Sequence, residues 1–262
     1  MQTENHSGKL TIITVCYNAK QPLEETLESI KHQTDQDFEY IVIDGQSNDG
    51  TIELIKRNQA AIDRSLSEPD KGIYDAMNKG LNLATGQFTL FINAGDTLYK
   101  TDTIKHIKTL ITDEDDVVLF PCISKNGKLL DSYYGDFPKL TWESYGCHQG
   151  YVVRTELYSA RQFNECYKIK ADRELLLRLY DSGAHFRYED SAPICIYDTD
   201  GVSNNNLLKK ELENFLISIN TPGGATFKSF VLFFTKTLVF SAFRVLGIDW
   251  KSAKSKFFKL YR

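Results

Sequence analysis

The chain lacks the features that mark exported, membrane-spanning and disulfide-stabilised proteins. Its 262 residues include five cysteines, an odd number with no Cys-x-x-Cys pair, which favours buried, inert thiols in a reducing compartment. The first eight residues are polar and contain no apolar stretch of the kind that a signal peptide needs. The longest uncharged apolar run, near the C-terminus, is too short to span a bilayer core of roughly 30 Å. We therefore expect a cytoplasmic protein.

Two phosphate-binding motifs are also missing. No Gly-x-Gly-x-x-Gly follows the first predicted strand, which argues against a dinucleotide-binding dehydrogenase. The same position has no Gly-rich loop with Arg or Lys, which argues against a nucleotidyltransferase. The net charge is −4, and because residues 228–262 carry eight basic residues against one aspartate, that segment is +7 and the remainder −11. An acidic body does not suit a nucleic-acid partner, whose binding depends on neutralising phosphates.

What is present is an alternation of apolar strands and amphipathic helices, which is typical of a doubly wound α/β fold. A helix is predicted over 73–84, and Gly86, in the left-handed conformation, is expected to end it. An earlier helix is expected to begin after Asn48–Asp49, which would cap its N-terminus. Strands are predicted over 9–16, 39–44, 88–92, 117–123 and 151–154, and further helices over 101–111 and 207–220. Asn126–Gly127 predicts a hairpin with a returning strand over 128–134. Residues 186–196 are predicted to form a strand pair or an extended edge.

Charged and polar residues gather where one predicted strand ends. The stretch from Ser67 to Asp96 contains a polar loop, a helix, a buried strand and then Asn93–Ala94–Gly95–Asp96. In open α/β sheets ligands bind at the carboxyl ends of the strands, so these residues are expected to form a site for a charged, polyhydroxylated ligand. Taken alone, Asp96 is equally a turn residue or the N-cap of the next helix.

These motifs, in this order, resemble those of the inverting, nucleotide-sugar-dependent glycosyltransferases of family 2, which have the GT-A fold. The resemblance covers roughly residues 9–200 and is most similar to the branch that assembles bacterial surface polysaccharides such as capsule or O-antigen. It is carried by TVCYN (14–18), IDGQSNDGT (43–51), EPDKGIYDAMNKG (68–80), ATG (84–86) and NAGD (93–96). It implies a GT-A type, nucleotide-binding mixed sheet flanked by helices, with a C-terminal helical appendage that is apolar and basic.

The resemblance implies a nucleotide-sugar site at this edge of the sheet. Tyr17 would stack on the base, and Asp44 would accept a hydrogen bond from the base imide, although the residues alone leave Asp44 open as a turn residue. The nucleotide-binding set is Thr14, Tyr17, Asn18, Asp44, Asp70, Lys71, Asp75 and Asn78, and the donor sugar is expected at Asn93, Ala94 and Gly95.

Asp96 is the expected ligand of a divalent metal cofactor, Mn²⁺ or Mg²⁺, which would neutralise the leaving nucleoside diphosphate. The family's commoner pattern has two acidic residues, whereas Asn93 and Gly95 stand here where a second carboxylate could be. One carboxylate with two phosphate oxygens is still a workable set for Mg²⁺, so we expect metal binding to depend on the nucleotide.

The acceptor side is expected in an aromatic-rich segment and the residues after it. Trp142 belongs to a group of aromatic residues. This group is expected either to consist of half-buried strand residues or to form a platform for a sugar ring. His148 is a metal ligand, an acceptor contact or a turn residue, and Gln149 follows it. From the residues alone Asp172 is the N-cap of a helix, but the resemblance implies that it is the general base of a single in-line displacement.

The last part of the chain changes character. Residues 226–248 are strongly apolar and residues 251–262 are basic, which predicts an interfacial helix and an anchor on an anionic membrane surface. The alternatives are a helix packed on the domain and a homodimer interface. The expected organisation is a disordered N-terminus (1–8), a GT-A domain (9–205, with a nucleotide-sugar half 9–100 and an acceptor half 101–205) and a helical membrane-associating tail (206–262).

The expected function is transfer of a sugar from a nucleotide donor, UDP-linked, to a carbohydrate acceptor that is lipid-linked, at the inner face of the membrane. Such an enzyme would be a metal-dependent hexosyltransferase-type glycosyltransferase. The alternative is a non-catalytic nucleotide-sugar-binding or scaffold subunit of a polysaccharide assembly complex, which the reduced metal motif supports.

Overall fold

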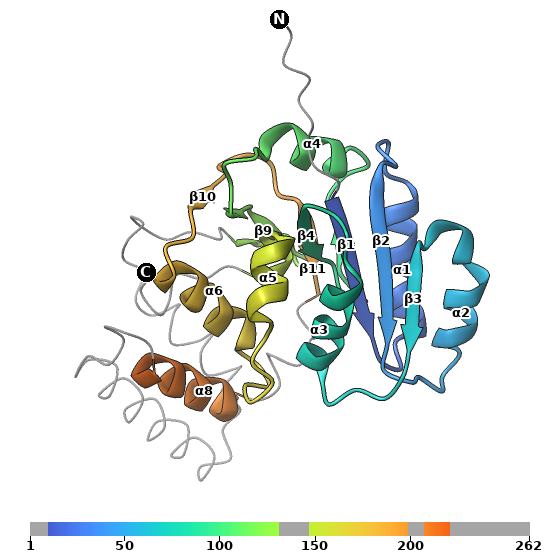
Figure 1. The fold of residues 1–262 in the computed structure, drawn as a ribbon. Helices are drawn as coiled ribbons and strands as arrows, with labels where there is room; N and C mark the ends of the chain where they lie inside the picture. The colour runs from blue at the N-terminus through green and yellow to red at the C-terminus, as the bar shows by residue number, and fades with distance from the viewer. Residues whose placement is uncertain (1–9, 131–146, 199–206, 221–262) are drawn as a thin grey trace, which may run out of the picture. The chain divides into compact units, whose positions relative to one another are not determined.

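A computed structural model describes residues 10–130, 147–198 and 207–220 (Figure 1). The contacts divide the chain into two units, Met1–Gly201 and Val202–Arg262. In the second unit the described element is the helix α8 (Leu207–Asn220), which has the bounds that the sequence predicts. The apolar and basic segment 226–262 and Trp142 lie outside the described residues.

A seven-stranded sheet forms the centre of the first unit. It contains β1 (Leu10–Cys16), β2 (Phe38–Asp44), β3 (Arg64–Ser67), β4 (Phe88–Phe91), β6 (Val117–Leu119), β9 (Tyr151–Arg154) and β10 (Phe186–Tyr188). The strand order is β10-β6-β9-β4-β1-β2-β3, and β9 runs antiparallel to both of its neighbours while the other pairs are parallel. The sheet is therefore mixed, as the family resemblance implies.

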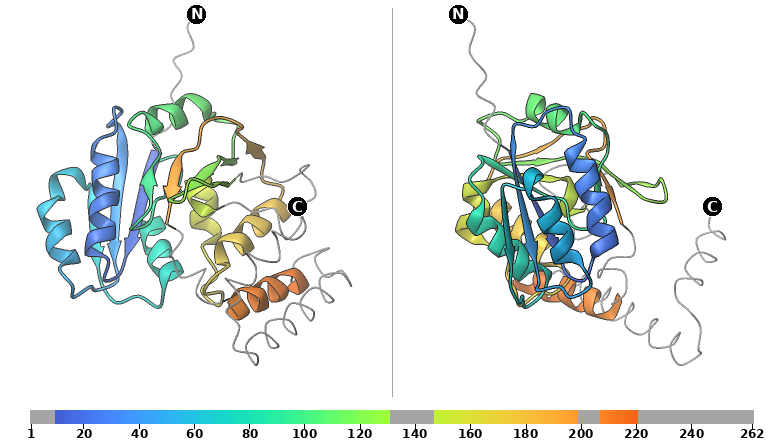
Figure 2. Two further views of the ribbon diagram at one scale, coloured as in Figure 1. Left: turned by 180° about the vertical axis from the view of Figure 1, so that it is seen from behind. Right: turned by 90° about the vertical axis from the view of Figure 1, so that its right-hand side faces the viewer.

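Helices cover both faces of this sheet. Figure 2 shows α1 (Lys20–Lys31) on one face and α3 (Ile73–Leu83) and α5 (Thr155–Arg161) on the other. The remaining helical elements of this unit are α2 (Thr51–Arg57), α4 (Thr103–Leu110), α6 (Ala171–Asp181) and the short 3₁₀ turns η1 (Gln59–Ala61) and η2 (His148–Gly150).

The central strands are apolar on both faces, because both faces are covered. Every residue of β1 and β2 is buried, as expected for strands of a parallel sheet. Ile12 belongs to the core on the side of α1, together with Leu23 and Leu27. On the other side α3 approaches closely at Gly80, where an added Cβ would lie 2.6 Å from Cγ2 of Ile13.

A second, four-stranded sheet lies beyond the main sheet. It contains β5 (Thr97–Leu98), β7 (Cys122–Ser124), β8 (Leu129–Leu130) and β11 (Cys195–Tyr197), in the order β5-β11-β7-β8. β7 and β8 form the hairpin predicted at Asn126–Gly127, where Gly127 has a φ of 75°. The small sheet adjoins the loop that contains Asp96, because β5 begins at the next residue.

Four local predictions were wrong. The apolar run 117–123 forms two strands in different sheets, divided at Pro121, which has no N–H to donate to a ladder. The extended pair over 186–196 is likewise β10 and β11 in different sheets. The helix α3 ends before Gly86, and Ala84, in an extended conformation, is its C-cap. Gly50, with a φ of 95°, occupies the N-cap of α2, although Asp49 accepts a hydrogen bond from the N–H of Thr51.

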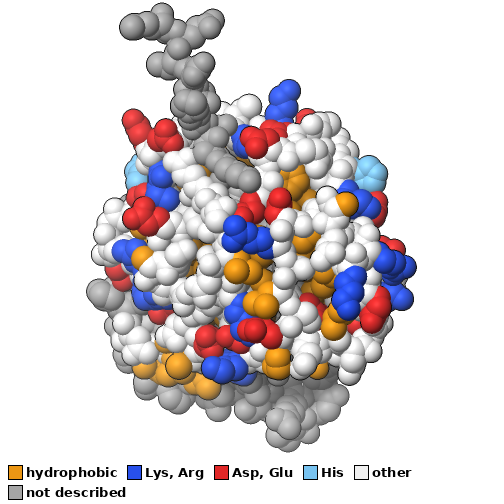
Figure 3. All heavy atoms as spheres, turned by 45° about the vertical axis from the view of Figure 1, so that its right-hand side comes forward, with side chains coloured by type: hydrophobic (Ala, Val, Ile, Leu, Met, Phe, Trp, Pro, Cys, Tyr) orange, Lys and Arg blue, Asp and Glu red, His pale blue; other side chains and the backbone are white. Residues whose placement is uncertain are grey.

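No helix in the described ranges has both the length and the apolar character needed to cross a membrane. Acidic and basic side chains are interspersed over the face drawn in Figure 3, rather than separated by sign.

Candidate active site

Polar side chains from three segments meet beyond the carboxyl end of β4. Asn93–Asp96 follows β4, η2 carries His148 and Gln149, and Asp172 lies in the first turn of α6. Two sets of contacts join them: Asp96 bonds to Gln149, and Asn93 bonds to His148, which pairs with Asp172. The structure thus brings together residues that the sequence assigned separately to the donor sugar, the metal, the acceptor and the base.

The loop after β4 is held from the opposite side by Thr26 of α1. The Thr26 hydroxyl donates to the main-chain carbonyl of Asp96 at 2.7 Å and accepts from the N–H of Gly95 at 3.0 Å. Gly95 has a φ of 99°, a conformation that favours glycine. The loop is therefore fixed through its main chain, which leaves the side chains of Asn93 and Asp96 on the side of the site.

Asp96 is buried, with 4% of its surface exposed. Its Oδ2 accepts from the Gln149 amide at 2.7 Å and its Oδ1 accepts from the main-chain N–H of Asp198 at 2.9 Å. Burial raises the pKa of Asp96 to about 6, against the opposing effect of these two bonds. A carboxylate with this pKa is ionised at neutral pH but lacks a neutralising partner among the residues that bond to it.

His148 connects the two ends of the site. Its Nε2 lies 2.8 Å from the Asn93 amide nitrogen, and its Nδ1 lies 3.6 Å from Oδ2 of Asp172. In a neutral ring with the proton on Nδ1, Nδ1 donates toward Asp172 and Nε2 accepts from the Asn93 amide, so both contacts are satisfied. When Nε2 is also protonated, a half-turn of the Asn93 amide lets its oxygen accept instead.

The ionisation of His148 and Asp172 is coupled. Burial lowers the pKa of His148, but the bond and the charge of Asp172, with the charge of Asp96, raise it above its usual value. Burial raises the pKa of Asp172, but the bond to His148 and nearby positive charge lower it to about 2. Asp172 is therefore a carboxylate at any physiological pH.

Asp172 is held in place but remains accessible. Its Oδ1 accepts from the Tyr74 hydroxyl at 3.2 Å and from the N–H of Arg173 at 2.8 Å, and 14% of its side chain is exposed. Lys170 is the N-cap of α6, so Asp172 lies inside the first turn and the N-cap interpretation of this residue was wrong. A negative charge in the first turn is favourable to the helix.

The donor atoms around Asp96 fit a hard divalent cation. Oδ1 of Asn93 and Oε1 of Gln149 are buried and have no hydrogen-bond partner within the described residues. Carboxylate and amide oxygens are the ligands that Mg²⁺ and Mn²⁺ prefer, and two unpaired buried oxygens beside a carboxylate indicate a missing polar partner. Asp96 and Asn93 are the residues that could hold such an ion.

The part of the site that is expected to bind the nucleotide has an exposed aromatic ring over a glycine. Tyr17 is 63% exposed at the end of β1. A Cβ on Gly45 would lie 3.2 Å from Cδ2 of Tyr17 and 2.3 Å from Oδ2 of Asp70, so glycine is required for these two side chains to come this close. Asn18, with a φ of 46°, accepts from the N–H of Asn48 at 2.9 Å and shapes the loop beside them.

Three residues expected to contact the nucleotide are occupied inside the protein. The Asn78 amide forms two hydrogen bonds with the main chain of Phe163, at 3.0 and 2.8 Å. Thr14 is fully buried between the carbonyl of Ile92 and the Tyr40 hydroxyl. Because none of these polar groups faces the site, we assign Thr14 and Asn78 to the framework rather than to ligand contact.

Asp44 is the third of these residues. It is fully buried, and its carboxylate accepts from the Ser47 hydroxyl and N–H, from the Ser67 hydroxyl at 2.6 Å, and weakly from Cys16. These bonds from Ser47 and Ser67 show that the Asp44 carboxylate orders the loops around those two residues. Lys71 is exposed, and its main chain is fixed by Asp75, which also pairs with Lys79 at 3.3 Å.

Sequence reasoning missed Thr26, Tyr74 and the main chain of Asp198. Tyr74 lies inside the motif that carried the resemblance, and its position one turn from a loop of charged residues was the available signal. Nothing in the sequence marks Thr26. An open hollow of about 480 Å³ lies near Asn78, Phe163 and Arg178, and its lining does not include Asp96, His148 or Asp172.

Comparisons with known proteins agree with this geometry. The sequence model of the family described as "Glycosyl transferase family 2" matches residues 11–175. A PGL/p-HBAD biosynthesis glycosyltransferase of Mycobacterium tuberculosis is 29% identical over 207 residues, which are 77% of this chain and 81% of the relative.

Two solved structures share the fold. S. aureus TarS 1–349 in complex with UDP-GlcNAc has a TM-score of 0.65 at 19% identity, over 81% of this chain and 67% of that chain. In another TarS structure the chain spans 40% of the protein. The mannosyltransferase PcManGT from Pyrobaculum calidifontis, in complex with GDP-Man and Mn²⁺, has a TM-score of 0.63 at 18% identity, over 83% of this chain and 66% of that chain. The chain therefore belongs to glycosyl transferase family 2 and has the GT-A fold.

Proposed function

We propose that the protein is an inverting glycosyltransferase that moves a sugar from a UDP-linked donor to a hydroxyl of a carbohydrate acceptor. The observation that carries this proposal is the cluster in which Asp96 bonds to Gln149, Asn93 bonds to His148, and His148 pairs with Asp172. It places an ionised carboxylate, which is accessible to an acceptor, beside a second carboxylate that suits the diphosphate end of a donor.

Asp172 supplies the base for this reaction. The acceptor oxygen attacks C1 of the donor sugar, the bond from C1 to the diphosphate oxygen breaks, and its electron pair leaves on the nucleoside diphosphate. The hydroxyl proton passes to Asp172, so one carboxylate is sufficient and no covalent intermediate forms. Tyr74 and His148 orient the Asp172 carboxylate for this transfer.

Asp96 and Asn93 would hold a divalent ion, Mn²⁺ or Mg²⁺, which when bound neutralises charge on the leaving diphosphate. This assignment is supported by the two unpaired buried oxygens and by PcManGT, which was solved with Mn²⁺. Tyr17 would stack on the base, with Asp70 and the loop at Asn18 beside it. Ala94 and Gly95 would border the donor sugar.

The choice of UDP is supported by the TarS complex with UDP-GlcNAc, whereas PcManGT was solved with GDP-Man. For the acceptor we propose a lipid-linked oligosaccharide at the inner face of the membrane, in surface polysaccharide biosynthesis. Support comes from the composition of residues 226–262, which are apolar and then basic and suit an anionic membrane surface.

Ligand binding and turnover test this proposal separately. The melting temperature is measured with UDP, GDP, ADP, CDP and dTDP, each with and without Mn²⁺, for the wild type and Asp96→Ala. A ligand at about 100 times its dissociation constant stabilises by roughly 2.7 kcal/mol. We expect UDP to raise the melting temperature only when Mn²⁺ is present, and we expect this rise to be lost in Asp96→Ala. If GDP is the only nucleotide that raises the melting temperature, the donor is GDP-linked and not UDP-linked.

Turnover is followed as UDP release from UDP-sugars in the presence of oligosaccharide acceptors. Asp172→Asn is expected to lower kcat by roughly 10²- to 10⁴-fold, the usual contribution of a general base. Asp181→Asn, at the exposed end of the same helix, is the matched control and should leave kcat unchanged. If Asp172→Asn transfers sugar at the wild-type rate, the assignment of the base fails.

The single carboxylate of the metal motif supports a second candidate, a non-catalytic nucleotide-sugar-binding subunit. It would give the same UDP shift but no turnover of any donor. Turnover that depends on Asp96 excludes it.

A further inference from the structure

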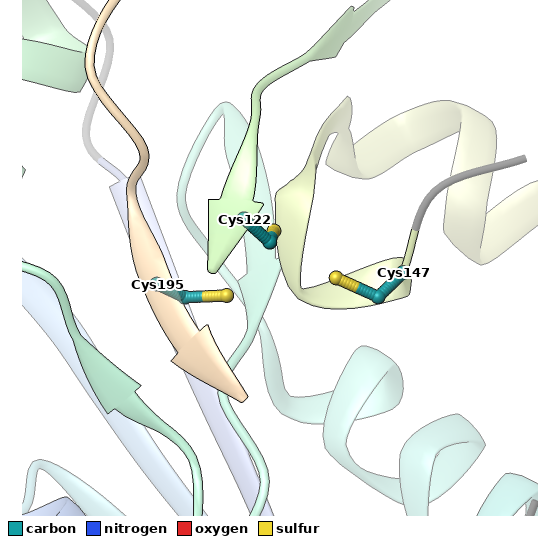
Figure 4. Close-up of side chains that lie close together, drawn as sticks. All are labelled: Cys122, Cys147 and Cys195. Carbon is teal, nitrogen blue, oxygen red and sulfur yellow. The ribbon is translucent and has the colours of Figure 1, made fainter. Parts of the chain in front are cut away.

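Three cysteine side chains that the proposed reaction does not use converge behind the active site. Cys122, Cys147 and Cys195 have sulfur atoms that all lie within 4.8 Å of one another. Figure 4 shows the three thiols directed toward a common point from three separate segments. Cys122 and Cys195 have no exposed surface, and Cys147 is partly buried.

The fold places these cysteines together although they are far apart in the sequence. Cys122 of β7 and Cys195 of β11 are direct partners in a parallel strand pair, so their side chains leave the same face of the small sheet. Cys147 is the residue before η2, and its carbonyl accepts from the N–H of Gly150. No short-range motif announces the cluster, because its members are separated by 25 and 48 residues.

We propose that Cys122, Cys147 and Cys195 form a binding site for one zinc ion. A Zn–S bond is about 2.3 Å long, so three sulfurs around a tetrahedral ion lie roughly 3.8 Å apart. The observed separations exceed this by at most about 1 Å, which small side-chain rotations remove. Water can occupy the fourth position beside Cys147, the partly exposed member, as it does in zinc sites with three protein ligands.

Ligand chemistry and charge select zinc. Thiolates bind soft and borderline ions, whereas Mg²⁺ and Mn²⁺ prefer oxygen, so this site is chemically distinct from the one at Asp96. With three thiolates Zn²⁺ leaves one net negative charge in a buried place, while Cu⁺ would leave two. The lower residual charge is the less costly to bury.

The site would fix the turn that carries catalytic contacts. Cys147 is followed by His148, which pairs with Asp172, and by Gln149, which bonds to Asp96. An ion bound to Cys147 and to two strands of the small sheet would tie the start of η2 to that sheet. Cys147 is thus a positioning residue for His148 and Gln149.

The first experiment measures metal in the purified full chain without reference to activity. Protein prepared under reducing conditions without chelator is expected to contain close to one zinc ion per chain, released by a thiol-blocking mercurial and counted with a colorimetric zinc indicator. Replacement by Co²⁺ should produce the sulfur-to-metal charge-transfer absorption and the strong visible bands of a tetrahedral thiolate site.

Variants then locate the ion. Cys147→Ser and Cys195→Ser are expected to weaken zinc binding by more than about 10-fold, since even loss of an outer-shell partner costs roughly 10- to 100-fold. Cys166→Ser, an exposed cysteine outside the cluster, is the matched control and should retain zinc. Asp96→Asn should also retain zinc, which separates this site from the nucleotide end.

Two results would overturn the proposal. One is a wild-type protein with no zinc, three reduced thiols and no thiolate absorption when Co²⁺ is added, which would make the cysteines apolar packing residues. The other is a mass lower by two hydrogens, which would show a disulfide between two of them. The cobalt spectrum of the wild type decides the matter even if a serine variant fails to fold.

Discussion

Nδ1 of His148 lies 3.6 Å from Oδ2 of Asp172, so the charge of an imidazole controls the basicity of the proposed catalytic carboxylate. While His148 is protonated, the pKa of Asp172 is held at about 2, which makes it a weak base. Once His148 loses its proton, its share of the positive charge that lowers the pKa of Asp172 is gone, while the charge of Lys170 remains. A general base is most effective when its pKa lies near the working pH.

The first prediction concerns the pH profile of kcat. Because the pKa of His148 is raised above 6.5, kcat should rise with pH through an inflection above that value. His148→Gln keeps a hydrogen-bonding side chain without the charge and should abolish this inflection. His32→Gln, an exposed histidine, is the control. An unchanged profile in His148→Gln would refute the coupling.

The second prediction is that Asp96→Asn stabilises the protein free of Mn²⁺, Mg²⁺ and nucleotide at alkaline pH. The folded pKa of Asp96, about 6, is above its ordinary value of 3.8, so wild-type stability is fully present below 3.8 and falls as pH rises through 6. Relative to the wild type, Asp96→Asn should gain about 2 kcal/mol between pH 4 and pH 8.

Urea unfolding at several pH values measures this difference. A half-turn of the Gln149 amide brings its unpaired oxygen to the new amide, so the hydrogen bond survives the substitution. Asp181→Asn should show no such pH-dependent gain. A variant that is less stable than the wild type by the same amount at every pH would contradict the assigned cost of burial.

The third prediction separates framework from ligand contact at Asn78. Asn78→Ala leaves the buried N–H and carbonyl of Phe163 without partners, so it should lower the free energy of unfolding by about 1–3 kcal/mol. Its dissociation constant for UDP, measured by calorimetry, should equal that of the wild type. Asn82→Ala, one turn later on the exposed face of α3, is the control and should cost less. Weaker UDP binding without loss of stability would restore Asn78 to the nucleotide site.

The fourth prediction concerns Tyr17. Stacking of a base on an aromatic ring contributes about 1–3 kcal/mol, so Tyr17→Ala should weaken UDP binding by roughly 5- to 150-fold. The melting temperature should hardly change, because the side chain is 63% exposed. Tyr17→Phe keeps the ring and should bind UDP like the wild type. Equal losses in both variants would show that the hydroxyl, and not stacking, makes the contact.

The sequence was sufficient to predict elements whose residues are apolar on a simple pattern. β1, β2 and β4 are fully buried, mainly apolar runs, because both of their faces are covered. β3 was missed because it is a polar, exposed edge strand, and α5 was also missed. The division of the run 117–123 between two sheets depends on long-range pairing, for which Pro121 was the only local signal.

At the site, residue types were easier to predict than the partners of their atoms. Asp96, His148 and Asp172 were each singled out, and the structure brings them together. The sequence does not show whether a polar atom already has a partner inside the protein. For that reason Asn78 and Asp44 were assigned to the nucleotide, although Phe163, Ser47 and Ser67 occupy their side chains.

The antiparallel strand β9 has a consequence for how the chain is made. β4 is complete at Phe91, but its partner on one side, Tyr151–Arg154, is synthesised roughly 3–13 s later at about 5–20 residues per second. During that interval the edge of β4 has no partner within the nascent chain, and an open, apolar edge can pair with another chain. We expect fragments that end before Tyr151 to aggregate on expression, while fragments that include Arg154 remain dispersed. The delay before β9 is synthesised would thus set the period in which this protein most needs a chaperone.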